Sequence, residues 1–331
     1  MTAAGVKALE LLPGLVIQTK FEPKIQEHVS CGCCGSDQYE TVHHFPENYF
    51  DPEWFDTYSW DANLGLELRI VECKDCGLIY QNKRFSQEAL HQLYPNTYIP
   101  TKINKAKEMA NHKFAFHIDW IKKHMGNKKN PSLLDVGTRY GVLPNLLRRE
   151  KIDAFGIEMN LKCVQAAGNS GMEEVYLGTV DSLNNVMNSR TQKQIDAVAM
   201  FDLIEHLLDP KGDLEEIAKF QPKGGKLFIS TMDISSMGYK VFGKDWYYLH
   251  GQHTFYFTPQ TITKLLESAG YRVVSIDRFG AMKSLRHLPG QIKKWMKYQW
   301  TMRWGVKGEK EWFAKHRPHL LDTMNIVAEK I

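Results

Sequence analysis

Short apolar runs alternate with segments of helical spacing along the chain beyond Pro131. Runs of apolar and β-branched residues predict strands at 132–136, 154–157, 174–177, 196–200, 225–230, 272–276 and 325–328. Between them, helices are expected at 142–150, 161–167, 213–220 and 261–269. Strands that alternate with helices in this way form a parallel sheet with helices on both faces. The pattern therefore predicts a doubly wound, mostly parallel α/β domain.

The chain before Pro131 follows a different pattern. A polar break at 127–131 separates it from the α/β domain. Residues 65–72 alternate apolar and polar side chains and predict a strand. We expect five parts: a lead-in (1–24), a cysteine module (25–85), a helical connector (86–130), the α/β domain (131–280) and a basic, aromatic C-terminal extension (281–331) that includes the last strand.

The composition narrows the class of protein. Hydrophobic residues make up 43% and charged residues 24% of the chain, which is usual for a globular protein. No apolar run is long enough for a transmembrane helix. The apolar run at 8–17 contains an acid and a proline and lacks a basic leader, so we expect no signal peptide and a cytoplasmic protein.

Four of the six cysteines form two similar pairs. The first pair is Cys31 and Cys34, and the second is Cys73 and Cys76. In each pair a glycine follows the second cysteine. Two such pairs can present four thiolates to one tetrahedral Zn²⁺ in a closed, structural site. Cys33 is then a bystander. Reduced thiols without metal, and a lost metal site kept as a fold element, remain open, whereas a disulfide framework fits poorly without secretion.

The first strand of the α/β domain leads into a glycine-containing loop. Gly137 and Gly141 are separated by three residues, a spacing that fits a dinucleotide pyrophosphate loop poorly. Glu158 ends the second strand, 21 residues after Gly137, where an acid can bind the two hydroxyls of a ribose. Together these residues predict a nucleoside ligand that lacks a pyrophosphate.

Two further segments make a family resemblance visible. Glu205 and His206, followed by Asp209 and Pro210, come after the fourth strand, and the run 222–225 (PKGG) comes before the fifth. This order resembles the class I S-adenosylmethionine (SAM)-dependent methyltransferases over residues 132–276, with 322–330 as the closing strand. The resemblance implies a Rossmann-like, seven-stranded sheet. The cysteine module, followed by Gly77 to Tyr80, is similar to the small zinc-ribbon-like modules of bacterial sugar or metabolite methyltransferases.

The resemblance also implies a set of cofactor-binding residues. They follow the first four strands and comprise Asp135, Gly137, Thr138, Tyr140, Gly141, Glu158, Met159, Thr179, Val180, Asp181, Phe201 and Asp202. Arg139 departs from the family pattern, because it replaces the usual middle glycine of the loop.

Transfer of a methyl group to a hydroxyl requires a base, and histidine is the best-tuned base near neutral pH. His206 follows the fourth strand, and His253 lies in an aromatic segment after the fifth strand, where related enzymes often place a histidine. A structural role in capping a loop is the alternative for each. Tyr140 and Glu205 are further candidates for the pocket, and His250 is a weaker one.

The expected function is methyl transfer to a small, sugar-containing acceptor, nucleotide-linked or lipid-linked, at oxygen in preference to carbon or nitrogen. An RNA methyltransferase is one alternative, but residues 25–85 are acidic and aromatic rather than basic, so nucleic acid is a poor fit. A non-catalytic scaffold, favoured by Arg139, is another. Residues 281–331 carry 11 Lys or Arg against 4 Asp or Glu, and the helical segment 288–304 could contact a membrane surface or simply pack on the domain.

Overall fold

The fold is described from a computed structural model of the chain. The structure describes residues 26–46, 67–89, 103–126, 128–172, 174–246, 248–278 and 322–331. The predictions for the lead-in, for most of the loop between the two cysteine pairs and for the segment 288–304 lie outside these residues. No helix in the described part of the chain has the length and hydropathy needed to cross a bilayer.

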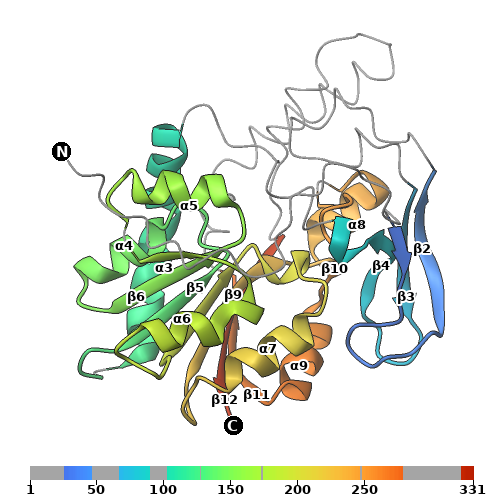
Figure 1. The fold of residues 1–331 in the computed structure, drawn as a ribbon. Coiled ribbons are helices and arrows are strands. Elements are labelled where there is room, and N and C mark those ends of the chain that lie inside the picture. Colours follow the sequence, from blue (N-terminus) through green and yellow to red (C-terminus); the bar gives the residue numbers. More distant parts are fainter. Residues whose placement is uncertain are drawn as a thin grey trace.

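A seven-stranded sheet forms the centre of the molecule, with the strand order β11-β12-β9-β8-β5-β6-β7 (Figure 1). Its strands are β5 (Ser132–Val136), β6 (Asp153–Glu158), β7 (Val175–Leu177), β8 (Ala197–Phe201), β9 (Lys226–Met232), β11 (Tyr271–Asp277) and β12 (Thr323–Lys330). The five strands from β5 to β9 pair in parallel, and β12 runs antiparallel between β9 and β11. The predicted α/β class and mostly parallel sheet are confirmed.

Helices cover both faces of this sheet. They are α3 (Ile103–Met125), α4 (Val142–Arg149), α5 (Leu161–Gly168), α6 (Leu183–Ser189), α7 (Pro210–Ala218) and α9 (Pro259–Ser268). The short helix α8 (Met237–Phe242) instead packs with Phe45, Leu68 and Ile70 of the N-terminal part of the chain. Successive residues of a buried strand point to opposite faces. Accordingly, Leu133 packs with side chains of α3 and α4, whereas Leu134 packs with those of α6, α7 and α9.

The sequence pattern missed two helices and displaced a third. The short helices α6 and α8 were not predicted, because neither has enough residues to show a periodic apolar stripe. Helix α7 begins at Pro210 rather than at 213. The Asp209 side chain caps this helix and accepts a hydrogen bond from Gly212 N, and proline is favoured in a first turn, so the Asp-Pro pair is the start of the helix.

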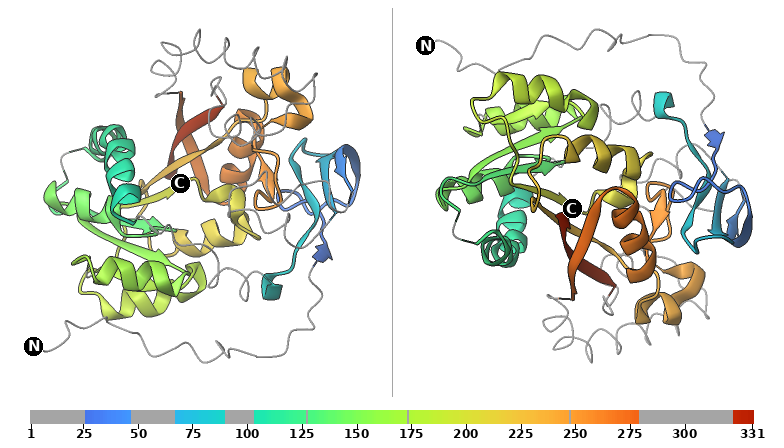
Figure 2. Two further views of the ribbon diagram at one scale, coloured as in Figure 1. Left: turned by 90° about the horizontal axis from the view of Figure 1, so that it is seen from above. Right: turned by 90° about the horizontal axis from the view of Figure 1, so that it is seen from below.

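A second, smaller sheet carries the cysteines. It contains β1 (Gln26–His28), β2 (Tyr39–Phe45), β3 (Leu68–Cys73) and β4 (Ile79–Phe85), in the order β1-β4-β3-β2. The short strand β10 (Phe255–Tyr256) joins it by pairing antiparallel with β4. Figure 2 shows this sheet on the flank of the molecule, beside β10 and far from α4 and α5.

The two sheets share one hydrophobic core. Val71, Leu78 and Tyr80 of the small sheet belong to the same buried cluster as Leu134 and Ile229 of the large one. The strand β10 comes from the part of the chain that the sequence assigns to the α/β domain. The cysteine module is thus N-terminal in sequence, but it packs against the large sheet and pairs with a strand that follows β9.

Candidate active site

The carboxyl ends of β5, β6, β7 and β8 lie along one edge of the large sheet. Val136 pairs with Ile157, Glu158 pairs with Leu177, and Phe201 pairs with Ser230 on β9, so the loops that follow these strands are neighbours. Ligands of doubly wound sheets bind at this edge. The predicted cofactor residues therefore gather at one place, although they span residues 135–202.

The loop after β5 has a backbone conformation that lets another group approach its main chain closely. Gly137 and Gly141 have φ angles of 69° and 68°, in the left-handed region that favours glycine. A Cβ atom on Gly137 would lie 2.8 Å from Cδ1 of Leu203, which follows β8. The two loops therefore pack closely only because residue 137 has no side chain.

Arg139 also adopts a left-handed conformation, with φ at 56°. This is the conformation expected of the glycine that it replaces in the family pattern. Its backbone N still donates a 2.9 Å hydrogen bond to Glu158 Oε2, and its guanidinium lies over the ring of Tyr140 at 5.3 Å from the centroid. The substitution leaves the loop with the shape of a glycine loop.

We expect Arg139→Gly to keep SAM affinity within about threefold and to change stability by no more than about 1 kcal/mol, because the backbone N–H and its bond to Glu158 remain. Arg139→Val should lower stability by about 1–3 kcal/mol, since a β-branched residue is strained at this φ. Thermal unfolding and SAM titration of both variants test this. Equal losses in the two would show that the guanidinium, not the backbone, maintains the loop.

Glu158 is held in place by backbone amides. Its side chain is buried; Oε2 accepts from Arg139 N, and Oε1 accepts from Asn160 N at 2.8 Å. Burial raises the pKa of this carboxyl, and the amide hydrogen bonds act in the opposite direction. Asn160 also caps α5. A carboxylate fixed by two loops at the end of β6 fits the two hydroxyls of a ribose.

The remaining predicted cofactor residues lie around the same edge. Thr179, Val180 and Asp181 form the turn after β7, and Met159 follows Glu158. Asp202 is exposed, with φ at 52°. Within the described residues, the buried Thr138 hydroxyl has no hydrogen-bond partner, which leaves one donor for a ligand at this loop. These features, with Asp135 buried at the strand end, fit SAM as the ligand.

Not every predicted residue faces the open edge in the same way. Tyr140 is buried and packs with Val142 and Cys163 beneath the loop. Phe201 is half-buried, and its ring lies 4.4 Å from the ring of His117 on α3, centroid to centroid. Helix α3 thus borders the edge through His117, and no sequence pattern predicts this contact.

The two candidate catalytic histidines lie next to each other. The ring centroids of His206 and His253 are 4.7 Å apart. Nδ1 of His206 is hydrogen-bonded to the backbone carbonyl of Gln252, which lies 46 residues further along the chain. His253 is buried and His206 is half-buried. The ring of His250 lies 3.8 Å from that of His253. The structure thus places both predicted histidines in one cluster.

Burial of the histidine cluster disfavours the charged forms of its imidazoles. Burial lowers the pKa of His206 and, together with the neighbouring histidines, lowers that of His253 well below its usual range. Burial also lowers the pKa of His250 to about 3. Because a carbonyl oxygen only accepts, the Nδ1 atoms of His206 and His253, bonded to Gln252 O and Tyr248 O at 2.8 Å, carry the hydrogens. Each Nε2 therefore carries the lone pair.

Residues outside the predicted set hold this cluster. Gln81 on β4 donates from Nε2 to the backbone oxygen of His253 at 2.6 Å and to that of His250 at 3.1 Å. Thr254 donates to the backbone oxygen of Glu205 through both N and Oγ1. The sequence offers no sign of Gln81, because the pairing of β10 with β4 is needed to bring it here.

The four cysteines of the two pairs come together. Their Sγ atoms all lie within 4.8 Å of one another, and the Cys31–Cys76 and Cys34–Cys73 sulfur distances are 3.5 Å. A tetrahedral Zn²⁺ with bonds of about 2.3 Å has its sulfurs about 3.8 Å apart, so this geometry fits zinc. Gly35 and Gly77 have positive φ angles and complete the turns. Cys33 lies outside the group.

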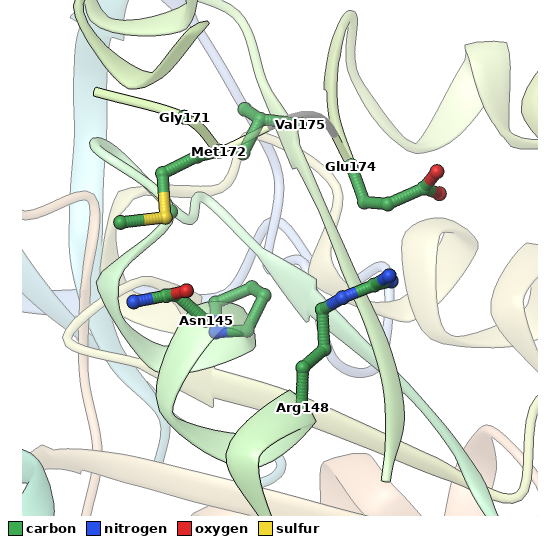
Figure 3. Close-up of a pocket in the computed structure, with 8 residues that line it drawn as sticks. Asn145, Arg148, Gly171, Met172, Glu174 and Val175 are labelled. Carbon is green, nitrogen blue, oxygen red and sulfur yellow. The ribbon is translucent and has the colours of Figure 1, made fainter. Parts of the chain in front are cut away.

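A surface hollow lies beside the loop but is not part of this edge. It is lined by Gly141, by side chains of α4 that include Asn145 and Arg148, and by Gly171, Met172, Glu174 and Val175 (Figure 3). Of the predicted site residues only Gly141 reaches it. The hollow therefore does not coincide with the strand ends where the predicted cofactor residues gather.

The strand order with an antiparallel β12, the glycine loop and the carboxylate at the end of β6 define a Rossmann-like SAM-dependent methyltransferase. Comparison with known proteins agrees. The sequence profile of a family described as "Methyltransferase domain" matches residues 107–276, just over half of the chain. The chain belongs to this methyltransferase family.

Individual relatives are more distant. The chain is 29% identical over 120 residues to a ubiquinone biosynthesis O-methyltransferase of Erwinia tasmaniensis. The aligned region covers 36% of this chain and 49% of that one. A protein of the same name from Aeromonas salmonicida is 27% identical over 164 residues, with coverages of 47% and 69%. The match thus spans about half to two thirds of these relatives.

Among solved structures, the chain is similar to a SAM-dependent methyltransferase from Archaeoglobus fulgidus. The TM-score is 0.44 at 17% identity, with coverage of 68% of this chain and 94% of that one. It is also similar to a putative methyltransferase from Bacillus halodurans, with a TM-score of 0.44 at 15% identity, covering 65% and 99%.

Proposed function

We propose that this methyltransferase transfers a methyl group from SAM to a hydroxyl of a small, sugar-containing acceptor. The observation that carries the proposal is the histidine pair. His206 follows β8 at the same edge of the sheet as the glycine loop, and its ring lies beside that of His253. Two neutral imidazoles with lone pairs on Nε2 suit an acceptor whose O–H proton must be removed.

In the proposed reaction, SAM supplies an electrophilic methyl group whose leaving group is a neutral thioether. An acceptor oxygen lone pair forms the new bond to the methyl carbon, and the carbon–sulfur bond breaks with its electron pair remaining on sulfur. The acceptor proton passes to Nε2 of His206 or His253. Glu158 and the loop at 137–141 hold the cofactor, so alignment of the reactants supplies much of the acceleration.

The acceptor atom and class rest on different supports. Oxygen is supported by the relatives, which are named ubiquinone biosynthesis O-methyltransferases. The sugar-containing acceptor is supported by the resemblance of the cysteine module to those of sugar and metabolite methyltransferases. We further propose that Cys31, Cys34, Cys73 and Cys76 bind one structural Zn²⁺, in keeping with their sulfur distances.

We expect His206→Asn and His253→Asn each to lower the rate of methyl transfer about 10²–10⁴-fold while leaving SAM affinity within about twofold. Asparagine keeps a donor near the position of Nδ1 and removes the Nε2 lone pair, so the backbone hydrogen bonds persist. Labelled methyl transfer from SAM into pools of nucleotide sugars and other metabolites measures the rate, and calorimetry measures SAM affinity.

The matched control is His44→Asn, because the His44 side chain is 53% exposed and lies on β2. It should leave transfer unchanged. A protein that binds SAM but labels no acceptor pool would contradict the sugar-containing acceptor, and one that binds no SAM would contradict the enzyme itself.

A further inference from the structure

One cluster at the active edge combines a carboxylate with the two histidines. Glu205, His206 and His253 each offer one donor atom, and these atoms all lie within 4.8 Å of one another. We propose that these three side chains bind a single divalent metal ion in an open site, separate from the four-cysteine site. This inference rests on the proposed function, methyl transfer at the same active edge, but it replaces the role of His206 and His253 as bases with a role as metal ligands.

The imidazoles are already in the tautomer that a metal requires. Nδ1 of His206 donates to Gln252 O, and Nδ1 of His253 donates to Tyr248 O, both at 2.8 Å. Metal-binding histidines commonly donate their other ring N–H to a backbone carbonyl or carboxylate, which fixes the ring and raises its basicity. In both rings, Nε2 is left as the ligand atom.

The third ligand is positioned as firmly as the other two. Glu205 is buried, and its Oε2 accepts a 2.9 Å hydrogen bond from Thr231 Oγ1 on β9. Its backbone oxygen accepts from Thr254. A carboxylate oxygen that a hydroxyl donor orients beside two imidazoles can serve as the third ligand of a divalent ion.

The donor set indicates the kind of ion. Two imidazoles and one carboxylate suit Mn²⁺, Fe²⁺, Co²⁺ or Zn²⁺, and three protein ligands leave coordination positions open, unlike the closed four-cysteine set. An ion here would coordinate the acceptor hydroxyl and lower its pKa. The O–H bond would then break with the proton passing to solvent water, because both Nε2 lone pairs are bound to the ion. The rest of the methyl transfer is unchanged.

Manganese titration tests the site in protein that holds one equivalent of zinc and no more, the amount expected at the four thiolates, because Mn²⁺ prefers oxygen and nitrogen ligands to thiolates. The expected result is one equivalent of bound Mn²⁺, detected by calorimetry and by electron paramagnetic resonance. His206→Asn and His253→Asn should each weaken Mn²⁺ binding at least about tenfold, and Thr231→Val should weaken it about tenfold by releasing Glu205. His44→Asn is the matched control, since His44 contacts Glu67 in an exposed pair with no second histidine.

Binding with the same affinity in the wild type and in both histidine variants would overturn the proposal, as would no binding to a wild type that binds SAM. SAM affinity is measured on every variant, so that unfolded protein is recognised. Methyl transfer without added metal that depends on His206 and His253, in a protein that binds no Mn²⁺, would refute the metal site and leave the proposed function standing.

Discussion

Glu158→Ala is expected to remove measurable SAM binding, lowering affinity at least 100-fold. Glu158 would lose its hydrogen bonds to the ribose, and charge-assisted bonds contribute about 1.5–3 kcal/mol each, so the loss of two corresponds to about 3 kcal/mol or more. The variant also leaves Arg139 N and Asn160 N without their acceptor, so the loop that surrounds the cofactor becomes less ordered. Calorimetric titration with SAM measures the effect.

Two further variants separate charge from shape. Glu158→Gln keeps an acceptor oxygen and should bind SAM at an affinity between those of the wild type and the alanine variant. Glu215→Ala, on an exposed residue of α7 whose ion pair with Lys211 is worth little, should bind SAM as the wild type does. SAM affinity in Glu158→Ala equal to that of Glu215→Ala would place the ribose elsewhere.

Cys73→Ser is expected to lower the melting temperature by at least about 5 °C and to abolish stoichiometric zinc. The Cys73 side chain is buried and its sulfur lies 3.5 Å from that of Cys34, so a serine breaks the tetrahedral set in a place where water cannot replace it. Metal analysis and thermal unfolding of the purified variant provide the measurements. The strand that follows, β4, carries Gln81, so methyl transfer should fall as well.

Cys33→Ser is the control for this prediction. Cys33 is half-buried and outside the group of four, so its variant should keep one equivalent of zinc and melt within about 2 °C of the wild type. A wild-type protein with far less than one equivalent of zinc, or a Cys73→Ser protein that melts like Cys33→Ser, would refute the zinc site.

The large sheet could be predicted because its central strands β5, β8 and β9 are buried on both faces and are therefore mostly continuous apolar runs. The acid at the end of β6 could also be predicted as a candidate ribose ligand, because an acid at this distance after a glycine loop can bind the two ribose hydroxyls. Arg139 could not be judged from its identity alone. Its chemistry suggested a damaged loop, whereas its φ of 56° shows a backbone that still turns as glycine would.

The surroundings of the histidines were not predictable for a different reason. His206 and His253 could be named as candidates, but their contact depends on β10 pairing with β4, between residues far apart in the chain. A two-residue strand has no period to detect. Glu205 was marked as a pocket residue, yet its place beside both rings follows from Thr231 and Thr254, which no motif distinguishes.

The pairing of β10 with β4 has a consequence for anyone who recombines such enzymes. A chimera that takes residues 25–85 from a relative and keeps the rest would combine a foreign β4 with the native β10, and a foreign residue would face the carbonyls that Gln81 now contacts. A crossover within the interval between β4 and α3 would therefore look harmless in an alignment but would separate Gln81 from the carbonyls that it contacts. Keeping these contacts would require transplanting segment 248–257 together with the N-terminal strands.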